Sequence, residues 1–161
     1  MNMQDMIKNE KVNVEGIPSS YFLIGLISAF ENRFQSLADR EMKEISWKQF
    51  FAIICINMCN ESPTIKELSE VLGSSHQNVK QILLKLESKG FVEFKVDEND
   101  KRKQRIVLTK ACMDFCNKNN DLSMSAMGQM FEGIPEKDIQ TTIKTLLSIE
   151  SNMRQRMESL N

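Results

Sequence analysis

The chain has 161 residues, of which 41% are hydrophobic and 27% charged, and its formal net charge is -1. These values predict one folded domain or one compact protomer of an oligomer, and they exclude a disordered chain. No apolar run reaches the roughly 18 residues that a membrane span needs, and the polar start lacks the apolar stretch of a secretory signal, so we expect a cytoplasmic protein with no membrane partner.

Positive charge is concentrated in the middle of the chain. Residues 64–110 hold ten Lys or Arg and seven Asp or Glu, a net charge of +3, whereas the remainder holds eleven and fifteen, a net charge of -4. Four of the five residues in 101–105 are cationic, a density suited to neutralising neighbouring phosphates. The pattern predicts an acidic frame that carries a basic, nucleic-acid-binding segment.

The first part of the chain predicts a tail and a long helix. We expect residues 1–16 to form a flexible tail. Residues 18–43 have apolar side chains at intervals of three and four, which predicts a helix that begins near a proline. This helix is longer than one protomer's core can cover, so its side chains Phe22, Ile24 and Ile27 are predicted to lie in a homodimer interface.

Two capping boxes mark the next two helices. Ser46 with Gln49 predicts a helix that continues to about residue 59, and this helix is apolar nearly all round and therefore central. Thr64 with Glu67 predicts a short helix that ends at Gly73, a residue suited to a left-handed helix C-terminus.

A second short helix and a hairpin follow. Ser74 or Ser75 offers the N-cap of a helix that ends before Gly90, and two short helices joined at a glycine make a helix-turn-helix. Residues 91–96 and 104–109 then predict two strands around a charged loop, which together form a wing.

Two more helices complete the predicted fold, to about residue 131 and from about 135 to 160, with a break at a glycine and a proline between them. The fold class is mainly α with a small β-hairpin wing (α+β), a winged helix-turn-helix on a helical dimerisation frame. The predicted organisation is a single protomer, residues 17–161, in which residues 17–43 and 110–161 form the frame and residues 46–109 form the winged helix-turn-helix.

The candidate site lies on the second helix of the helix-turn-helix and on the wing. Gln and Asn pair with adenine edges, while Lys and Ser bind phosphate or guanine. The helix candidates are Ser75, His76, Gln77, Asn78, Lys80, Gln81 and Lys85. The wing candidates are Asp100, Lys101, Arg102, Lys103 and Arg105. A solvated helix face is the alternative for the helix alone, but its combination with a cationic hairpin favours double-stranded DNA as the partner, with Arg102 entering the minor groove.

Catalytic and metal-binding patterns are missing from the sequence. His76 is the only histidine, and no nucleophile with a base, no paired carboxylates and no phosphate-cradling glycine loop stand out. We therefore expect no enzyme activity, no cofactor and no metal. A winged helix that serves only protein interaction is the alternative from another class, and the wing's cations argue against it.

Four cysteines form two pairs at a spacing of four, which puts each pair on one face of a helix. The pairs are Cys55 with Cys59 and Cys112 with Cys116. This spacing does not suit a disulfide within a helix. Packing in an apolar setting is the favoured interpretation, and a redox-sensing or metal-binding role for the thiols stays open as an alternative form of regulation.

Several stretches of the chain, taken together, follow one family pattern from about residue 17 onward. These are Ile45, Ser46, Gln49, Ala52 and Ile53, then residues 68–93, residues 99–102 (Asn, Asp, Lys, Arg), residues 107–109 (Val, Leu, Thr) and residues 131–136. In these stretches the sequence resembles the MarR family of bacterial winged-helix regulators. It departs from the family at His76, where Arg is frequent, and at Cys112, where a glycine is common.

The resemblance implies a sequence-specific DNA-binding transcriptional regulator, a homodimeric repressor built on the first and last two helices. It implies that Asp100 steadies Arg102 as the arginine enters the minor groove. It also implies a pseudo-palindromic operator and release by a small aromatic or lipophilic effector.

Overall fold

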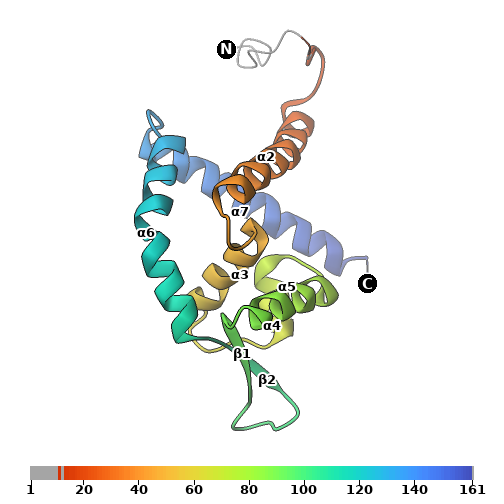
Figure 1. The fold of residues 1–161 in the computed structure, drawn as a ribbon. Helices are drawn as coiled ribbons and strands as arrows, with labels where there is room; N and C mark the ends of the chain where they lie inside the picture. The colour runs from red at the N-terminus through yellow and green to blue at the C-terminus, as the bar shows by residue number, and fades with distance from the viewer. Residues whose placement is uncertain (1–10, 12, 161) are drawn as a thin grey trace. The chain divides into compact units, whose positions relative to one another are not determined.

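The computed structural model describes residue 11 and residues 13–160 (Figure 1). The chain divides into two units, residues 1–113 and 114–161. The predicted tail, residues 1–16, lies mostly outside the described residues. In its described part Val14 is buried, and its carbonyl accepts a hydrogen bond of 3.1 Å from the Ile17 amide. Across the described residues, no helix combines the length and the apolar character needed to cross a membrane.

The first unit opens with α2 (Ser19–Glu41), whose N-cap is Pro18, as the sequence predicts. The helix ends when Met42 turns to an extended backbone, and the Asp39 carboxylate accepts a hydrogen bond of 2.6 Å from the Trp47 amide across the following loop. Most of the surface of α2 is exposed within this single chain.

Helix α3 (Trp47–Met58) is the centre of the first unit. Its predicted capping box is present: the Gln49 amide donates to the Ser46 hydroxyl at 3.3 Å, and the Ser46 amide donates to the Gln49 side chain at 3.0 Å. The helix contacts α2, α4, α5 and β2, and it buries Ala52, Ile53 and Ile56 among them. Its nearly continuous apolar surface explains why it lies inside.

Helices α4 (Ile65–Leu72) and α5 (His76–Ser88) form the helix-turn-helix. The turn begins at Gly73, whose φ of 59° and ψ of 32° are left-handed, a conformation that glycine adopts without the steric cost of a Cβ. Leu68, Leu83 and Leu86 have no exposed surface. Each such leucine contributes about 1.5–3 kcal/mol by leaving water, so these side chains fix the packing of α5 on α3 and α4.

The wing consists of β1 (Val92–Val96) and β2 (Gln104–Leu108), which pair antiparallel in a register that runs from Val92 opposite Leu108 to Val96 opposite Gln104. One face of the hairpin is buried through Val92 and Ile106. A two-stranded hairpin is marginally stable by itself, so its attachment to the helices determines its orientation.

Helices α6 (Lys110–Met130) and α7 (Glu136–Glu158) complete the chain, separated by a turn with Gly133 at φ 74° and by the N-cap Pro135. The second unit consists of α7 and most of α6. The predicted fold class, mainly α with a small β-hairpin, is confirmed.

Candidate nucleic-acid interface

The turn of the helix-turn-helix presents the N-terminal end of α5. The Ser75 hydroxyl accepts a hydrogen bond of 3.3 Å from the Asn78 amide, which caps the helix as predicted. The Asn78 side chain donates to the Ser74 hydroxyl at 2.8 Å. These bonds order the first turn of α5, where base contacts are usually made in helix-turn-helix proteins.

Helix α5 buries one apolar face and leaves its polar side chains exposed. Val79, Leu83 and Leu86 are buried in the first unit. The predicted contact residues are all exposed: Ser75, His76, Gln77, Asn78, Lys80, Gln81 and Lys85. The structure therefore brings the predicted helix residues together on one free surface that offers amide, hydroxyl and ammonium groups.

The tip of the wing presents Arg102, whose side chain is 91% exposed. The Asp100 carboxylate accepts hydrogen bonds from both the backbone amide and Nε of Arg102, each at 3.1 Å. These two bonds hold the pKa of Asp100 below its ordinary value, with the side chain of Arg102 as the larger cause. The guanidinium is thus exposed to solvent while Asp100 holds its Nε edge.

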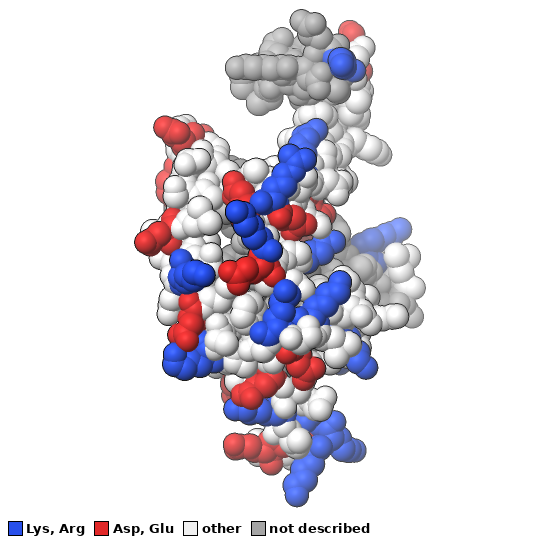
Figure 2. Space-filling view, in the orientation of Figure 1, with Lys and Arg blue, Asp and Glu red and all other residues white. Residues whose placement is uncertain are grey.

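Three other wing cations were predicted to contact phosphates, and they differ from one another in exposure. Lys101 and Lys103 are exposed, although Lys103 also lies 3.7 Å from the Asp100 carboxylate. Figure 2 shows Lys and Arg side chains gathered over the wing at the foot of the view. Arg105 is only partly exposed, because its guanidinium donates to the Asp97 and Glu67 carboxylates and to the Ser62 carbonyl. These contacts favour an anchoring role for Arg105 over a phosphate contact.

Asp97 and Glu67 are site residues that sequence reasoning missed as partners of the wing. Asp97 is a buried carboxylate, and the hydrogen bond from Arg105, followed by those from the Asp100 and Asn99 amides, lowers its pKa to about 2. The sequence shows Asp97 only as the first residue of a polar loop. The signal that could have suggested its role is its place directly after a strand, where a carboxylate can cap the loop's amides.

The predicted dimer residues lie on the exposed side of α2. Ile24 is 51% exposed and Ile27 37%, whereas Phe22 is half-buried. Each of the two units also has other large hydrophobic side chains that are exposed. They include Tyr21, Leu26 and Phe30 on α2, Leu122, Met124 and Met127 on α6, and Ile143, Leu147, Met153 and Met157 on α7.

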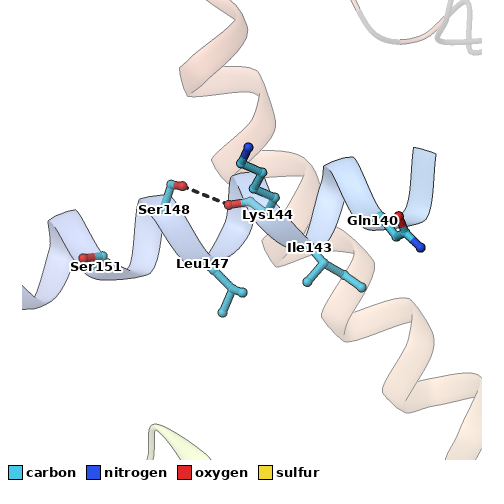
Figure 3. Close-up of a pocket in the computed structure, with 6 residues that line it drawn as sticks. All are labelled: Gln140, Ile143, Lys144, Leu147, Ser148 and Ser151. Carbon is cyan, nitrogen blue, oxygen red and sulfur yellow. Dashed lines mark hydrogen bonds between the residues drawn. The ribbon is translucent and has the colours of Figure 1, made fainter. Parts of the chain in front are cut away.

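A shallow groove runs along α7 and is lined by residues of that helix alone (Figure 3). Ile143 and Leu147 project from one side of the helix, while Lys144 projects from the other. The Ser148 hydroxyl donates a hydrogen bond of 2.9 Å to the Lys144 carbonyl. The groove therefore offers an apolar helix face rather than an enclosed binding pocket.

The four cysteines form no disulfide and lie in different settings. Cys55 and Cys112 are buried, and Cys59 and Cys116 are half-buried. Burial raises the pKa of the Cys55 thiol, and its neighbour Cys59 raises it further. The four-thiolate metal site, which the sequence left open, has no support, because no three metal-binding side chains come together within the part of the chain that the structure describes. A raised pKa disfavours the reactive thiolate and supports the packing interpretation.

A helix-turn-helix with an exposed polar second helix, followed by a cationic hairpin, defines the class of winged-helix proteins. The MarR family model matches residues 45–103, which span α3 to the wing. From α3 to the wing, this chain is therefore similar to the MarR family.

Solved structures of this family have the same fold. The MarR/EmrR family transcriptional regulator from Acinetobacter sp. ADP1 is 18% identical, with a TM-score of 0.76, over 89% of this chain and 99% of that one. A MarR protein from Peptoclostridium difficile is 17% identical, with a TM-score of 0.76, over 96% and 100%. The MepR–DNA complex of S. aureus is 16% identical, with a TM-score of 0.70, over 80% and 94%. At these identities the likeness establishes the fold.

Proposed function

We propose that this chain is a MarR-family transcriptional regulator, a sequence-specific repressor that acts in the cytoplasm as a homodimer and reads a pseudo-palindromic operator. The observation that carries the proposal is the joint exposure of the polar face of α5 and of Arg102 on the wing, both within the first unit. A helix-turn-helix places its second helix in the major groove, and a solved relative with this fold is complexed with DNA.

In the proposed complex α5 supplies the base contacts. The Gln77 and Gln81 amides suit the donor and acceptor pair that adenine presents in the major groove. Lys80 and Lys85 suit phosphates or guanine. His76 stands at the start of the helix, where a direct contact would set the preference for one base pair.

The wing supplies the second contact of the proposed complex. The exposed guanidinium of Arg102 suits a narrow minor groove, where the negative potential is strongest. Lys101 and Lys103 suit the flanking phosphates. The hydrogen bonds from Arg102 to Asp100 orient the arginine before DNA is bound, which lowers the entropic cost of the contact.

The proposed homodimer is supported by the exposed apolar surfaces of α2, α6 and α7. Soluble monomers rarely expose contiguous apolar patches beyond a few hundred Å². Tyr21 is 75% exposed, Phe30 62% and Leu122 61%. A second copy of the chain would cover such side chains and would place two α5 helices on one two-fold-symmetric DNA site.

We also propose that a small aromatic or lipophilic effector releases the repressor from DNA. The junction of α2 and α3 offers aromatic surface for such a molecule. Phe34 packs edge-on against Trp47 with ring centroids 4.6 Å apart, and Trp47 stacks on Phe51, which is 39% exposed. Because Trp47 is the only tryptophan, its fluorescence would report binding at this junction directly.

A duplex titration tests the DNA-binding part of the proposal. Binding of a fluorescent duplex should be tight at low salt and should weaken linearly in log–log form as salt rises, because each phosphate contact releases about one counterion. Absence of binding to any duplex at low salt would reject the proposal and favour a winged helix that serves only protein interaction. Release of bound duplex by peroxide, abolished when all four cysteines are replaced by Ser, would favour the redox alternative.

A further inference from the structure

Two consecutive residues of β2 attach the wing to the loop before α4. The Ile106 amide donates a hydrogen bond of 2.8 Å to the Pro63 carbonyl, and Arg105 Nη1 donates one of 3.1 Å to the Ser62 carbonyl. Neighbouring residues of the strand thus bind neighbouring carbonyls of the loop before α4. These two carbonyls of the loop therefore help to position the hairpin.

Arg105 extends this attachment into the capping box of α4. Its Nη1 lies 3.2 Å from Glu67 Oε2, the same oxygen that accepts the Thr64 amide at 2.7 Å. Glu67 therefore serves both the N-terminus of the first helix of the helix-turn-helix and the guanidinium of the wing. The positive charge of Arg105 is one of the causes that lower the pKa of Glu67, after its two hydrogen bonds with Thr64.

From Arg105 a series of hydrogen bonds leads to the wing tip. Arg105 Nε donates to Asp97 Oδ2, and Asp97 Oδ1 accepts the amides of Asn99 at 2.9 Å and Asp100 at 2.8 Å. Asp100 in turn holds the backbone amide and Nε of Arg102. Every link joins the next through charged groups or fixed backbone amides.

We propose that Arg105 is a positioning residue, which through Asp97 and Asp100 fixes the wing-tip Arg102 relative to the helix-turn-helix. The proposal rests on the DNA-binding function proposed above and assigns Arg105 to orientation of the wing rather than to a phosphate contact. The side chain of Asp97 is 7% exposed, and that of Arg105 is 26% exposed, whereas Arg102 is 91% exposed. The inner links are thus shielded from competing water, whereas the side chain of Arg102 is accessible to a ligand.

The planar fork of arginine is what this role requires. Nε of Arg105 donates to the wing loop, and Nη1 donates to acceptors at and before the α4 cap. The planar guanidinium holds these two donors at a fixed relative angle. A lysine ammonium carries the same charge on a flexible stem, but it lacks the rigid fork. Arg105→Lys would therefore preserve a simple phosphate contact but lose the hydrogen bonds that position the wing.

Hydrogen exchange of the DNA-free protein tests the positioning directly. The Asp97 amide donates to the Lys103 carbonyl, and the Lys103 amide donates to the Asp100 carbonyl. In Arg105→Gln and in Arg105→Lys, these two amides should exchange about tenfold faster or more, because charge-assisted hydrogen bonds that order the loop are lost. The core amides of Leu68 and Leu83 should keep their protection, which shows that the fold is intact. If Arg105→Gln does not fold, Arg105→Lys carries the test.

Lys95→Gln is the matched control, because Lys95 pairs with Arg105 across the strands and its side chain is 58% exposed. This variant should leave the wing amides unchanged. Unchanged exchange at Asp97 and Lys103 in both Arg105 variants would overturn the proposal, whether or not the protein binds DNA. Failure of the parent to bind any duplex would instead reject the proposed function. The hydrogen exchange of the variants would still show whether Arg105 orders the wing.

A double-mutant cycle tests the consequence for DNA. Arg102→Ala should weaken operator binding strongly in the parent but by less than half that factor in the Arg105→Lys background, because Arg102 is already misplaced there. Additive effects, together with Arg105→Lys binding like the parent, would show that Arg105 acts as a cationic contact only and would contradict the proposal. The salt dependence of Arg105→Lys should match that of the parent, since the charge is retained.

Discussion

At the scale of single residues, the exposed guanidinium of Arg102 separates contact with DNA from folding. Arg102→Ala should weaken binding to the operator by about 1–3 kcal/mol per wing and leave the stability unchanged, because the side chain contributes almost no buried surface. Lys101→Ala should instead lower the slope of log affinity against log salt by about one unit. Fluorescence anisotropy over a range of salt measures both effects. Parent-like binding by both variants would show that the wing does not contact DNA.

A second prediction at this scale concerns the ionisation of Asp97. Its pKa is about 2 in the folded protein, below the ordinary 3.8, because hydrogen bonds from Arg105 and from the Asp100 and Asn99 amides favour the carboxylate. A lowered folded pKa means that the stabilisation is present above the unfolded value and is lost as the pH falls through about 2. The carboxyl carbon shift of Asp97 in NMR should therefore titrate near 2, and in Arg105→Gln the midpoint should rise toward 3.8. A midpoint near 4 in the parent would contradict the observed contacts.

At the scale of elements, the turn between α4 and α5 depends on Gly73. Alanine at this left-handed position should reduce the free energy of unfolding by about 1–2 kcal/mol, because its Cβ crowds the following carbonyl. Gly128→Ala is the matched control, since Gly128 lies within α6, where no atom lies within 4 Å of an added Cβ. This change should stabilise the helix by about 0.5–1 kcal/mol. Urea unfolding measures both, and equal effects of the two changes would show that the turn places no special demand on residue 73.

The elements themselves were largely predictable from the sequence because their signals are local. The capping boxes of α3 and α4 and the left-handed Gly73 each involve residues within a few positions of one another. The partners of Arg105 were not predictable in this way. Two of them lie 43 residues away at Ser62 and 38 at Glu67, so the packing of the wing on the α4 cap decides these contacts.

At the scale of the whole molecule, the exposed apolar helices predict a stable homodimer. Sedimentation at micromolar concentration should give twice the chain mass of 18.6 kDa. Ile24→Asp combined with Ile27→Asp should shift the protein toward the monomer, because charges would be buried at the interface. Val71→Asp, at an equally exposed apolar residue of α4, should leave the dimer intact. A monomeric mass for the parent would contradict the predicted interface.

The two-unit organisation shows what the sequence left undetermined at this scale. Periodicity predicts α2, α6 and α7 and the stripes along them, but it does not say what covers those stripes. Residues 110–161 were predicted as one part of the dimerisation frame, and the structure divides the chain within α6, after Met113. The covering of an apolar face is a property of the assembled partners, so it calls for a measurement on the dimer.

Selection of DNA from a random pool tests most directly whether α5 and the wing of a dimer read DNA. We expect enrichment of an inverted repeat whose half-site centres lie about one helical turn, roughly 10 base pairs, apart or a multiple of it. In Gln77→Ala the preference at one base pair of each half-site should relax. Failure to enrich any sequence, or enrichment unchanged by replacements on α5 and at Arg102, would contradict a reading role for α5 and the wing.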